Sequence, residues 1–128
     1  MQNLEVMGQK ALNFNQAGYN CAQAVACAFS EQTGLEEKTL FKLAEGLGGG
    51  MGCYEGPCGA LSGAILVLSY RLSGYKTKEA TYKVVGELYT KFVQKFGSSV
   101  CKGLKEQELC SECIEFASNL AAQIFSAK

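Results

Sequence analysis

The sequence predicts an all-α fold, a single-domain helical bundle of about five to six helices over residues 1–128, with a glycine-rich loop before the central helix. Apolar residues recur three and four positions apart along most of the chain, and no segment alternates apolar and polar residues over the length of a strand. The chain is 48% hydrophobic and 19% charged, which is enough apolar material for one core and too little charge for disorder. One stretch alone is rich in glycine, and it separates two sets of helical patterns.

Three helices are expected before the glycine-rich stretch. Gly18 ends the first, and Asn20 is placed to cap the second, which Gly34 ends in the left-handed conformation. The third covers about residues 36–47. The apolar residues that define the first helix are Leu4, Met7, Ala11, Leu12 and Phe14.

The glycine-rich stretch at residues 48–57 is expected to be a loop, because glycine costs about 1 kcal/mol per helical position relative to alanine. Pro57, the only proline, is expected at the first position of the central helix, which runs to about Leu72. Apolar residues surround this helix between residues 60 and 68, so it should be the most enclosed. The remaining elements are expected at residues 77–96, at a short turn capped by Ser98 and Ser99, and at residues 108–125.

Charge and hydropathy exclude several classes of protein. Twelve basic side chains balance twelve acidic ones without long blocks of either sign, so we expect no nucleic-acid partner. The most apolar run, residues 60–68, is shorter than the roughly 20 residues of a membrane span. Residues 1–12 show no secretory pattern, so a cytoplasmic location is expected, where cysteines stay reduced.

The glycine-rich segment does not match a nucleotide-binding loop. In the spacing G-x-G-x-x-G counted from Gly46, Met51 occupies the place of the last glycine. No strand precedes the segment, and no Gly-Lys-Ser/Thr follows it. We therefore expect its glycines to serve backbone geometry and to bring Cys58 to the core.

The cysteines are the residues most able to carry chemistry. The chain has seven of them and no histidine, which excludes imidazole haem ligation, mixed Cys/His zinc sites and Cys-His nucleophiles. Cys21, Cys58 and Cys101 each fall at a predicted helix start, where free amides and the helix dipole favour thiolate. Cys113 lies on the inward stripe of the last helix, so the four thiols are candidates to converge on an iron–sulfur cluster or a four-cysteine zinc site.

The other three cysteines give weaker signals. Cys27 is expected on the more polar side of its helix, without a role. Cys53 lies in the glycine-rich loop, where it could be a spare ligand or a resolving thiol. Cys110 forms C-x-x-C with Cys113, but without the βαβ context of thioredoxin-like sites.

These residues resemble the C_GCAxxG_C_C family of redox-active proteins, small bacterial and archaeal proteins with widely spaced cysteines around a glycine motif. The motif is present from Cys58 to Gly63 as C-G-A-L-S-G, with the cysteine ahead of the glycine rather than behind it. The other matching positions are Cys21 within Y-N-C-A-Q-A, Cys101 after the F-G stop, and Cys113 ahead of Phe116 and Ala117. The resemblance covers about residues 17–125.

The resemblance implies a helical, redox-linked protein, often associated with oxidoreductase or transport functions. A similar domain occurs in split-Soret cytochromes c, which are dimers that carry haem and an iron–sulfur site. This chain lacks C-x-x-C-H and any histidine, so the haem function does not carry over. A homodimer and a redox partner protein are further expectations from the resemblance.

Three hypotheses follow, and the sequence leaves all three open. In the first, an electron carrier or redox sensor binds an iron–sulfur cluster of two or four irons through Cys21, Cys58, Cys101 and Cys113, near the small residues Gly59 and Gly63. In the second, a metal-free protein uses Cys58 as attacking thiol, with Cys53 or another nearby cysteine as resolver. In the third, zinc is structural and the protein is a binding module, although structural zinc sites draw their ligands in closer pairs.

Overall fold

The computed structural model describes residues 6–74 and 77–127, and the regular structure there is helical, as the sequence predicts. Leu4, expected on the first helix, lies outside the described residues. The 3-10 turn η2 (Glu45–Leu47) and the π-type turn η3 (Gly50–Tyr54) lie between α4 and α5. The α-helices are α1 (Met7–Gln16), α2 (Cys21–Ala28), α3 (Ser30–Thr33), α4 (Glu37–Ala44), α5 (Gly59–Leu72), α6 (Lys78–Phe96), α7 (Cys101–Glu106) and α8 (Cys110–Ala127).

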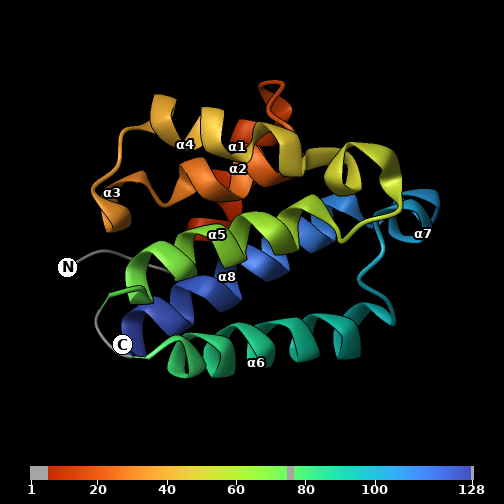
Figure 1. The fold of residues 1–128 in the computed structure, drawn as a ribbon. Coiled ribbons are helices and arrows are strands. Elements are labelled where there is room, and N and C mark those ends of the chain that lie inside the picture. Colours follow the sequence, from red (N-terminus) through yellow and green to blue (C-terminus); the bar gives the residue numbers. More distant parts are fainter. Residues whose placement is uncertain (1–5, 75–76, 128) are drawn as a thin grey trace.

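α5 and α8 pack together at the centre of the molecule, and other helices cover them on two sides (Figure 1). α1 and α2 pack on one side, with α4 against α2, and α6 lies along the opposite side. η3 and α7 contact each other at one end of the bundle, at the right of the view. None of the helices in the described ranges has both the length and the apolar character needed to cross a bilayer.

Capping residues set helix boundaries where the sequence predicts them. Asn20 accepts a hydrogen bond from the Gln23 amide at 2.9 Å, and the Gln23 side chain accepts one from the Asn20 amide at 3.0 Å. This reciprocal pair starts α2 one residue before Cys21. Thr77 caps α6, and Gly97 ends it with a φ of 81°.

Several boundaries differ from the prediction. The third helix ends at Ala44 and continues as the 3-10 turn η2, and the last helix begins at Cys110. The second helix stops at Ala28, and the following turn α3 is a separate element that Gly34 ends with a φ of 78°. Pro57 is not the first residue of α5. It precedes the N-cap, which is Cys58, and it pairs with Val100 in an isolated antiparallel β-bridge.

Ser98 and Ser99 do not cap α7, contrary to the prediction. The Ser98 hydroxyl oxygen accepts a hydrogen bond from the Val100 amide at 3.0 Å, and Val100 is itself the N-cap. The Ser99 hydroxyl oxygen accepts one from the Tyr89 hydroxyl at 2.7 Å. Both serines therefore shape the chain before the helix, and Ser99 ties that segment to α6.

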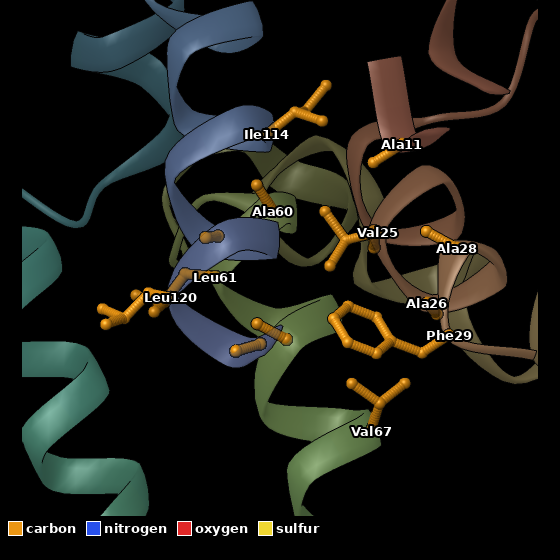
Figure 2. Packing of buried hydrophobic residues seen from close by; sticks show 14 of the residues in the cluster. Ala11, Val25, Ala26, Ala28, Phe29, Ala60, Leu61, Val67, Ile114 and Leu120 are labelled. Carbon is orange, nitrogen blue, oxygen red and sulfur yellow. The ribbon is translucent and has the colours of Figure 1, made fainter. Parts of the chain in front are cut away.

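The core lies where α2, α5 and α8 meet, as Figure 2 shows. Val25 and Phe29 at the α2 end point toward α5, on which Ala60 and Val67 are fully buried. The Phe29 ring stacks on Phe125 with centroids 5.0 Å apart, which joins α2 to the end of α8. α5 is buried along most of its length, so it is the enclosed central helix that its apolar circumference predicts.

Cys27 belongs to this core, and its expected place on a polar side of the second helix is wrong. Its exposed fraction is 1%, and its sulfur lies 3.5 Å from the Glu37 carbonyl oxygen. The reason is that α4 covers this side of α2. Gln23 is itself buried and donates a hydrogen bond to the Phe41 carbonyl oxygen at 3.2 Å. The polar residue near Cys27 on this helix therefore does not indicate that this side is exposed to solvent.

Two glycines of α5 let α2 approach its backbone. A Cβ atom placed on Gly63 would lie 2.6 Å from the Ala22 carbonyl oxygen, and one placed on Gly59 would lie 3.1 Å from the Ala22 amide nitrogen. The first distance is shorter than any tolerable contact with backbone. The small residues of the C-G-A-L-S-G motif therefore hold the beginnings of α2 and α5 close together.

We predict that Gly63→Ala lowers the free energy of unfolding by about 1–3 kcal/mol, because the new methyl group must push α2 away. Gly86→Ala in α6 is the matched control, since a Cβ there meets nothing within 4 Å. That control should raise the free energy of unfolding by about 0.5–1 kcal/mol through its better helix propensity. Urea unfolding followed by circular dichroism measures both, and equal effects of the two substitutions would contradict the close packing.

Candidate cysteine site

Five of the seven cysteines come together at the end of the bundle where α2, α5, α7 and α8 begin. Cys21, Cys101 and Cys110 are the first residues of α2, α7 and α8, and Cys58 is the N-cap of α5. Cys113 lies one turn further along α8. The thiols interact with one another electrostatically, so all four predicted site cysteines share one place, with Cys110 among them.

Two backbone hydrogen bonds place Cys58 beside Cys101. The Cys58 amide donates to the Ser99 carbonyl oxygen at 2.6 Å, and the Cys101 amide donates to the Gly56 carbonyl oxygen at 2.9 Å. These bonds run in opposite directions across the bridge between Pro57 and Val100, which fixes the register of the two segments. The cysteine that starts α5 and the cysteine that starts α7 are therefore positioned by backbone rather than by their side chains.

The glycine-rich loop packs directly on this arrangement. Gly50 has a φ of 56°, in the left-handed region, and a Cβ atom there would lie 2.5 Å from the Cβ of Cys101. The Gly50 carbonyl oxygen accepts a hydrogen bond from the Gly56 amide at 3.1 Å, which closes the loop. The loop is irregular, as predicted, and its glycines serve backbone geometry around the cysteines.

Cys58 is the thiol most easily ionised in the site. Its pKa is lowered to about 7, chiefly because the Cys113 thiol donates a hydrogen bond to it. Burial acts in the opposite direction, and the amides of Ala60 and Leu61 at the start of α5 favour the thiolate again. Cys58 therefore has the thiolate character expected from the sequence, chiefly through Cys113 and less through its helix start, whereas the same expectation is wrong for Cys21 and Cys101, whose pKa values are raised.

The neighbouring thiols have the opposite tendency. Burial, followed by the charge of the other cysteines, raises the pKa of Cys21 to about 12. The pKa of Cys113 is raised most by its hydrogen bond to Cys58, and that of Cys101 by burial. Without a cation, the site therefore stabilises a thiolate on Cys58 and keeps Cys21, Cys101 and Cys113 as neutral thiols near pH 7.

The thiols do not form a ready-made site for a single metal ion. Within residues 6–74 and 77–127, no three Cys, Asp or Glu side chains surround one point as a metal ion requires. A zinc ion would need each sulfur at about 2.3 Å in a tetrahedron. Binding of any metal species would thus require the thiols to lose protons and to turn toward a common centre.

Cys27 and Cys53 lie apart from the five clustered cysteines. Burial and then the charge of Glu37 raise the pKa of Cys27 to about 11. Cys53 is exposed, and its sulfur lies 3.5 Å from the Gly50 carbonyl oxygen within its own loop. A resolving role for Cys53 stays a prediction.

The sequence interpretation underrated Cys110. Its thiol and that of Cys21 share a hydrogen bond, and its charge raises the pKa of Cys21, Cys101 and Cys113. The available signal was its spacing, since residues three apart share a helix face and Cys113 already faced inward. The sequence did not show that the last helix begins at Cys110. Glu108 was expected inside that helix, but its φ is 60° and it lies before the helix.

Gly59 and Gly63 lie where α5 packs on the beginning of α2, and Gly59 is the one that lies beside a site cysteine. A Cβ atom on Gly59 would lie 3.3 Å from the Cβ of Cys21, and Gly63 faces the Ala22 backbone. The two glycines thus permit a neighbouring helix to approach, which was one of the two roles expected for them. Their contact with a cofactor stays a prediction.

Comparison with known protein families gives one match. The family model described as "Putative redox-active protein (C_GCAxxG_C_C)" matches residues 19–124, which include all five clustered cysteines. Comparison with curated proteins and comparison with solved structures give no significant match. The matched range begins just before the cap of α2 and ends within the last turns of α8.

We predict that Cys113→Ala raises the pKa of Cys58 in the metal-free protein, because it removes the donor that most favours the thiolate. The wild-type protein should gain thiolate absorbance as the pH rises through about 7, and the variant should gain it at higher pH. Cys27→Ala is the control and should leave the step in place, since the charge that acts on Cys27 is that of Glu37. Loss of this absorbance step in Cys58→Ser would assign the step to Cys58. A step at unchanged pH in Cys113→Ala would refute the hydrogen bond between Cys113 and Cys58.

We predict that Gly50→Ala exposes Cys101, whereas Gly52→Ala does not. Both glycines have positive φ, so alanine strains the backbone at either position by roughly 1 kcal/mol or more. A Cβ on Gly52 meets nothing within 4 Å, while one on Gly50 collides with Cys101. Maleimide labelling of Cys101, read by peptide mass spectrometry, should be several-fold faster in Gly50→Ala alone; equal rates in both variants would contradict the contact.

Proposed function

The chain belongs to the C_GCAxxG_C_C family of redox-active proteins, and from this we propose that it is an electron carrier or redox sensor that binds an iron–sulfur cluster. The proposed ligands are Cys21, Cys58, Cys101 and Cys113. The observation that carries the proposal is the convergence of these thiols, from four helices, at one end of the bundle. Such a cluster supplies one-electron transfer.

The charge balance of the site supports this proposal. The pKa values of Cys21, Cys101 and Cys113 are raised by burial and by the charge of neighbouring cysteines, so these thiols cannot ionise together with Cys58 unless positive charge is added among them. Iron supplies that charge, and its binding releases the thiol protons. In a four-iron cluster each cysteine binds a different iron, and in a two-iron cluster each iron takes two cysteines, so the four sulfurs need not surround a single point as zinc would demand.

The helix starts give the cysteines a second role. Cys21, Cys58 and Cys101 each lie where backbone amides have no partner within the helix, and the Ala60 and Leu61 amides already act on the sulfur of Cys58. Amides that donate to ligand sulfur stabilise added negative charge and raise the reduction potential. The same groups therefore favour the thiolate ligands and the reduced state.

One contact favours a second candidate function, metal-free thiol–disulfide exchange. The Cys58 sulfur accepts a hydrogen bond from the Cys113 thiol, so these two residues are placed as attacking and resolving thiols. Cys58 thiolate would attack a substrate disulfide, which forms a mixed disulfide and releases one substrate thiolate. Cys113 would then attack Cys58, which releases the second substrate thiol and leaves a Cys58–Cys113 disulfide.

Anaerobic reconstitution of the reduced protein with ferrous iron and sulfide tests the leading proposal. We expect brown colour, iron and acid-labile sulfide in the wild-type protein. We expect about tenfold or greater loss of bound iron in Cys21→Ser, Cys58→Ser, Cys101→Ser and Cys113→Ser, because each removes a ligand. Cys27→Ser and Cys53→Ser are the controls, one buried and one exposed, and both should retain the cluster.

Three other outcomes would overturn the cluster. A colourless, iron-free protein that cycles between two thiols and a Cys58–Cys113 disulfide would support thiol–disulfide exchange instead. Zinc at one ion per chain, with no iron, would support a structural metal site. Equal loss of iron in the two control variants would show that bound iron is not held by the clustered cysteines.

A further inference from the structure

The clustered cysteines exceed the proposed ligand set by one. Five thiols interact at the end of the bundle, and the proposed function assigns four of them to a cluster. Cys110 is the fifth, and it would remain uncoordinated beside the ligands. The inference below rests on that proposed function and concerns how the site responds to oxidation.

Cys110 lies beside one particular ligand, Cys21, at the end of the bundle. Its thiol shares a hydrogen bond with Cys21, and each of the two is the first residue of its helix. α2 and α8 pack against each other, so these helix starts are held together by the core behind them. A disulfide between the two sulfurs requires Cα atoms no more than about 7 Å apart, and the packing of α2 on α8 is what brings the two helix starts together.

The same pair forms the accessible edge of the site. Cys21 and Cys110 are partly exposed, whereas Cys58, Cys101 and Cys113 are buried, with exposed fractions of 4%, 9% and 0%. A small oxidant that arrives from solvent therefore meets Cys21 and Cys110 first. Oxidation at a cysteine depends on such access as well as on thiolate character.

We propose that Cys110 is a resolving thiol, which forms a disulfide with Cys21 when a hydroperoxide reaches the site and so withdraws Cys21 from the ligand set. The Cys110 sulfur attacks the peroxide oxygen: an S–O bond forms, the O–O bond breaks, and the alkoxide or hydroxide leaves with the thiol proton as alcohol or water. The Cys21 sulfur then attacks the Cys110 sulfenic acid, an S–S bond forms, and water leaves. Two thiols are oxidised and one hydroperoxide is reduced by two electrons.

This disulfide acts as a reversible block. With Cys21 tied to Cys110, only three of the proposed ligands remain available, and the cluster cannot be rebuilt. Reduction by a dithiol restores both thiols and the complete ligand set. Cys58, although it is the most easily ionised thiol, is shielded from the oxidant because it is buried.

The test uses the full chain in its reduced, metal-free form, treated anaerobically with one equivalent of hydrogen peroxide. Free thiols are then blocked, and the protein is digested and analysed by mass spectrometry. We expect a peptide pair cross-linked between Cys21 and Cys110 as the main product, with no variant required. A main product cross-linked between Cys58 and Cys113, or the absence of any cross-link, would overturn the proposal.

Reconstitution with iron and sulfide after the same treatment gives a second readout. We expect roughly tenfold less bound iron in the oxidised wild-type protein, with recovery after dithiothreitol, because one ligand is withheld. Cys110→Ser should bind iron before and after peroxide, while Cys53→Ser, which removes an exposed thiol outside the site, should respond as the wild type does. Circular dichroism checks that both variants are folded.

The outcomes separate this inference from the proposed function. If the reduced wild-type protein binds no iron, the cluster fails, and the cross-link still decides whether Cys21 and Cys110 form a redox pair. If iron binds and Cys110→Ser loses it without peroxide, Cys110 is a ligand and its assignment as a resolving thiol is wrong. If iron binds and peroxide produces no recoverable loss, the block does not exist although the cluster does.

Discussion

The site depends on a pair of backbone hydrogen bonds between segments that are far apart in the chain. The Cys58 amide bonds to Ser99, and the Cys101 amide bonds to Gly56, so each cysteine is held by the residues beside the other. A bridge of two residues has little stability alone and needs packing behind it. Gly50 supplies that packing on one side through its contact with Cys101.

The second constraint is the cost of gathering thiols in a buried place. A thiolate on one cysteine disfavours ionisation of the neighbouring cysteines. In this site Cys58 is the cysteine that ionises, and the Cys113 thiol donates a hydrogen bond to it. Such a site is stable as a set of thiols and becomes fully ionised only when positive charge enters it. Because its cysteines are held as protonated thiols, the site can lose those protons either by metal binding or by disulfide formation.

The fold was predictable where the signal is local. Asn20 and Gly97 mark helix ends through their own side-chain or backbone preferences, and the enclosed central helix follows from its apolar circumference. The burial of Cys27 and the bridge at Pro57 were not predictable, because both depend on segments that pack from elsewhere in the chain. Local polarity and helix-start rules contain no information about which element covers a given face.

The glycine motif explains why the cysteines need no close spacing in sequence. In small zinc sites, pairs such as C-x-x-C bring ligands together through a short loop. Here Gly59 and Gly63 let α2 pack against the backbone of α5, and this packing places Cys21 near Cys58. The backbone bridge at Pro57 and Val100 places Cys101 beside Cys58. Since the contact points lie on the backbone, a larger residue at Gly63 would separate the thiols although every cysteine remained in place. Cysteines and glycines of the motif are thus parts of one geometric arrangement, and neither set forms the site without the other.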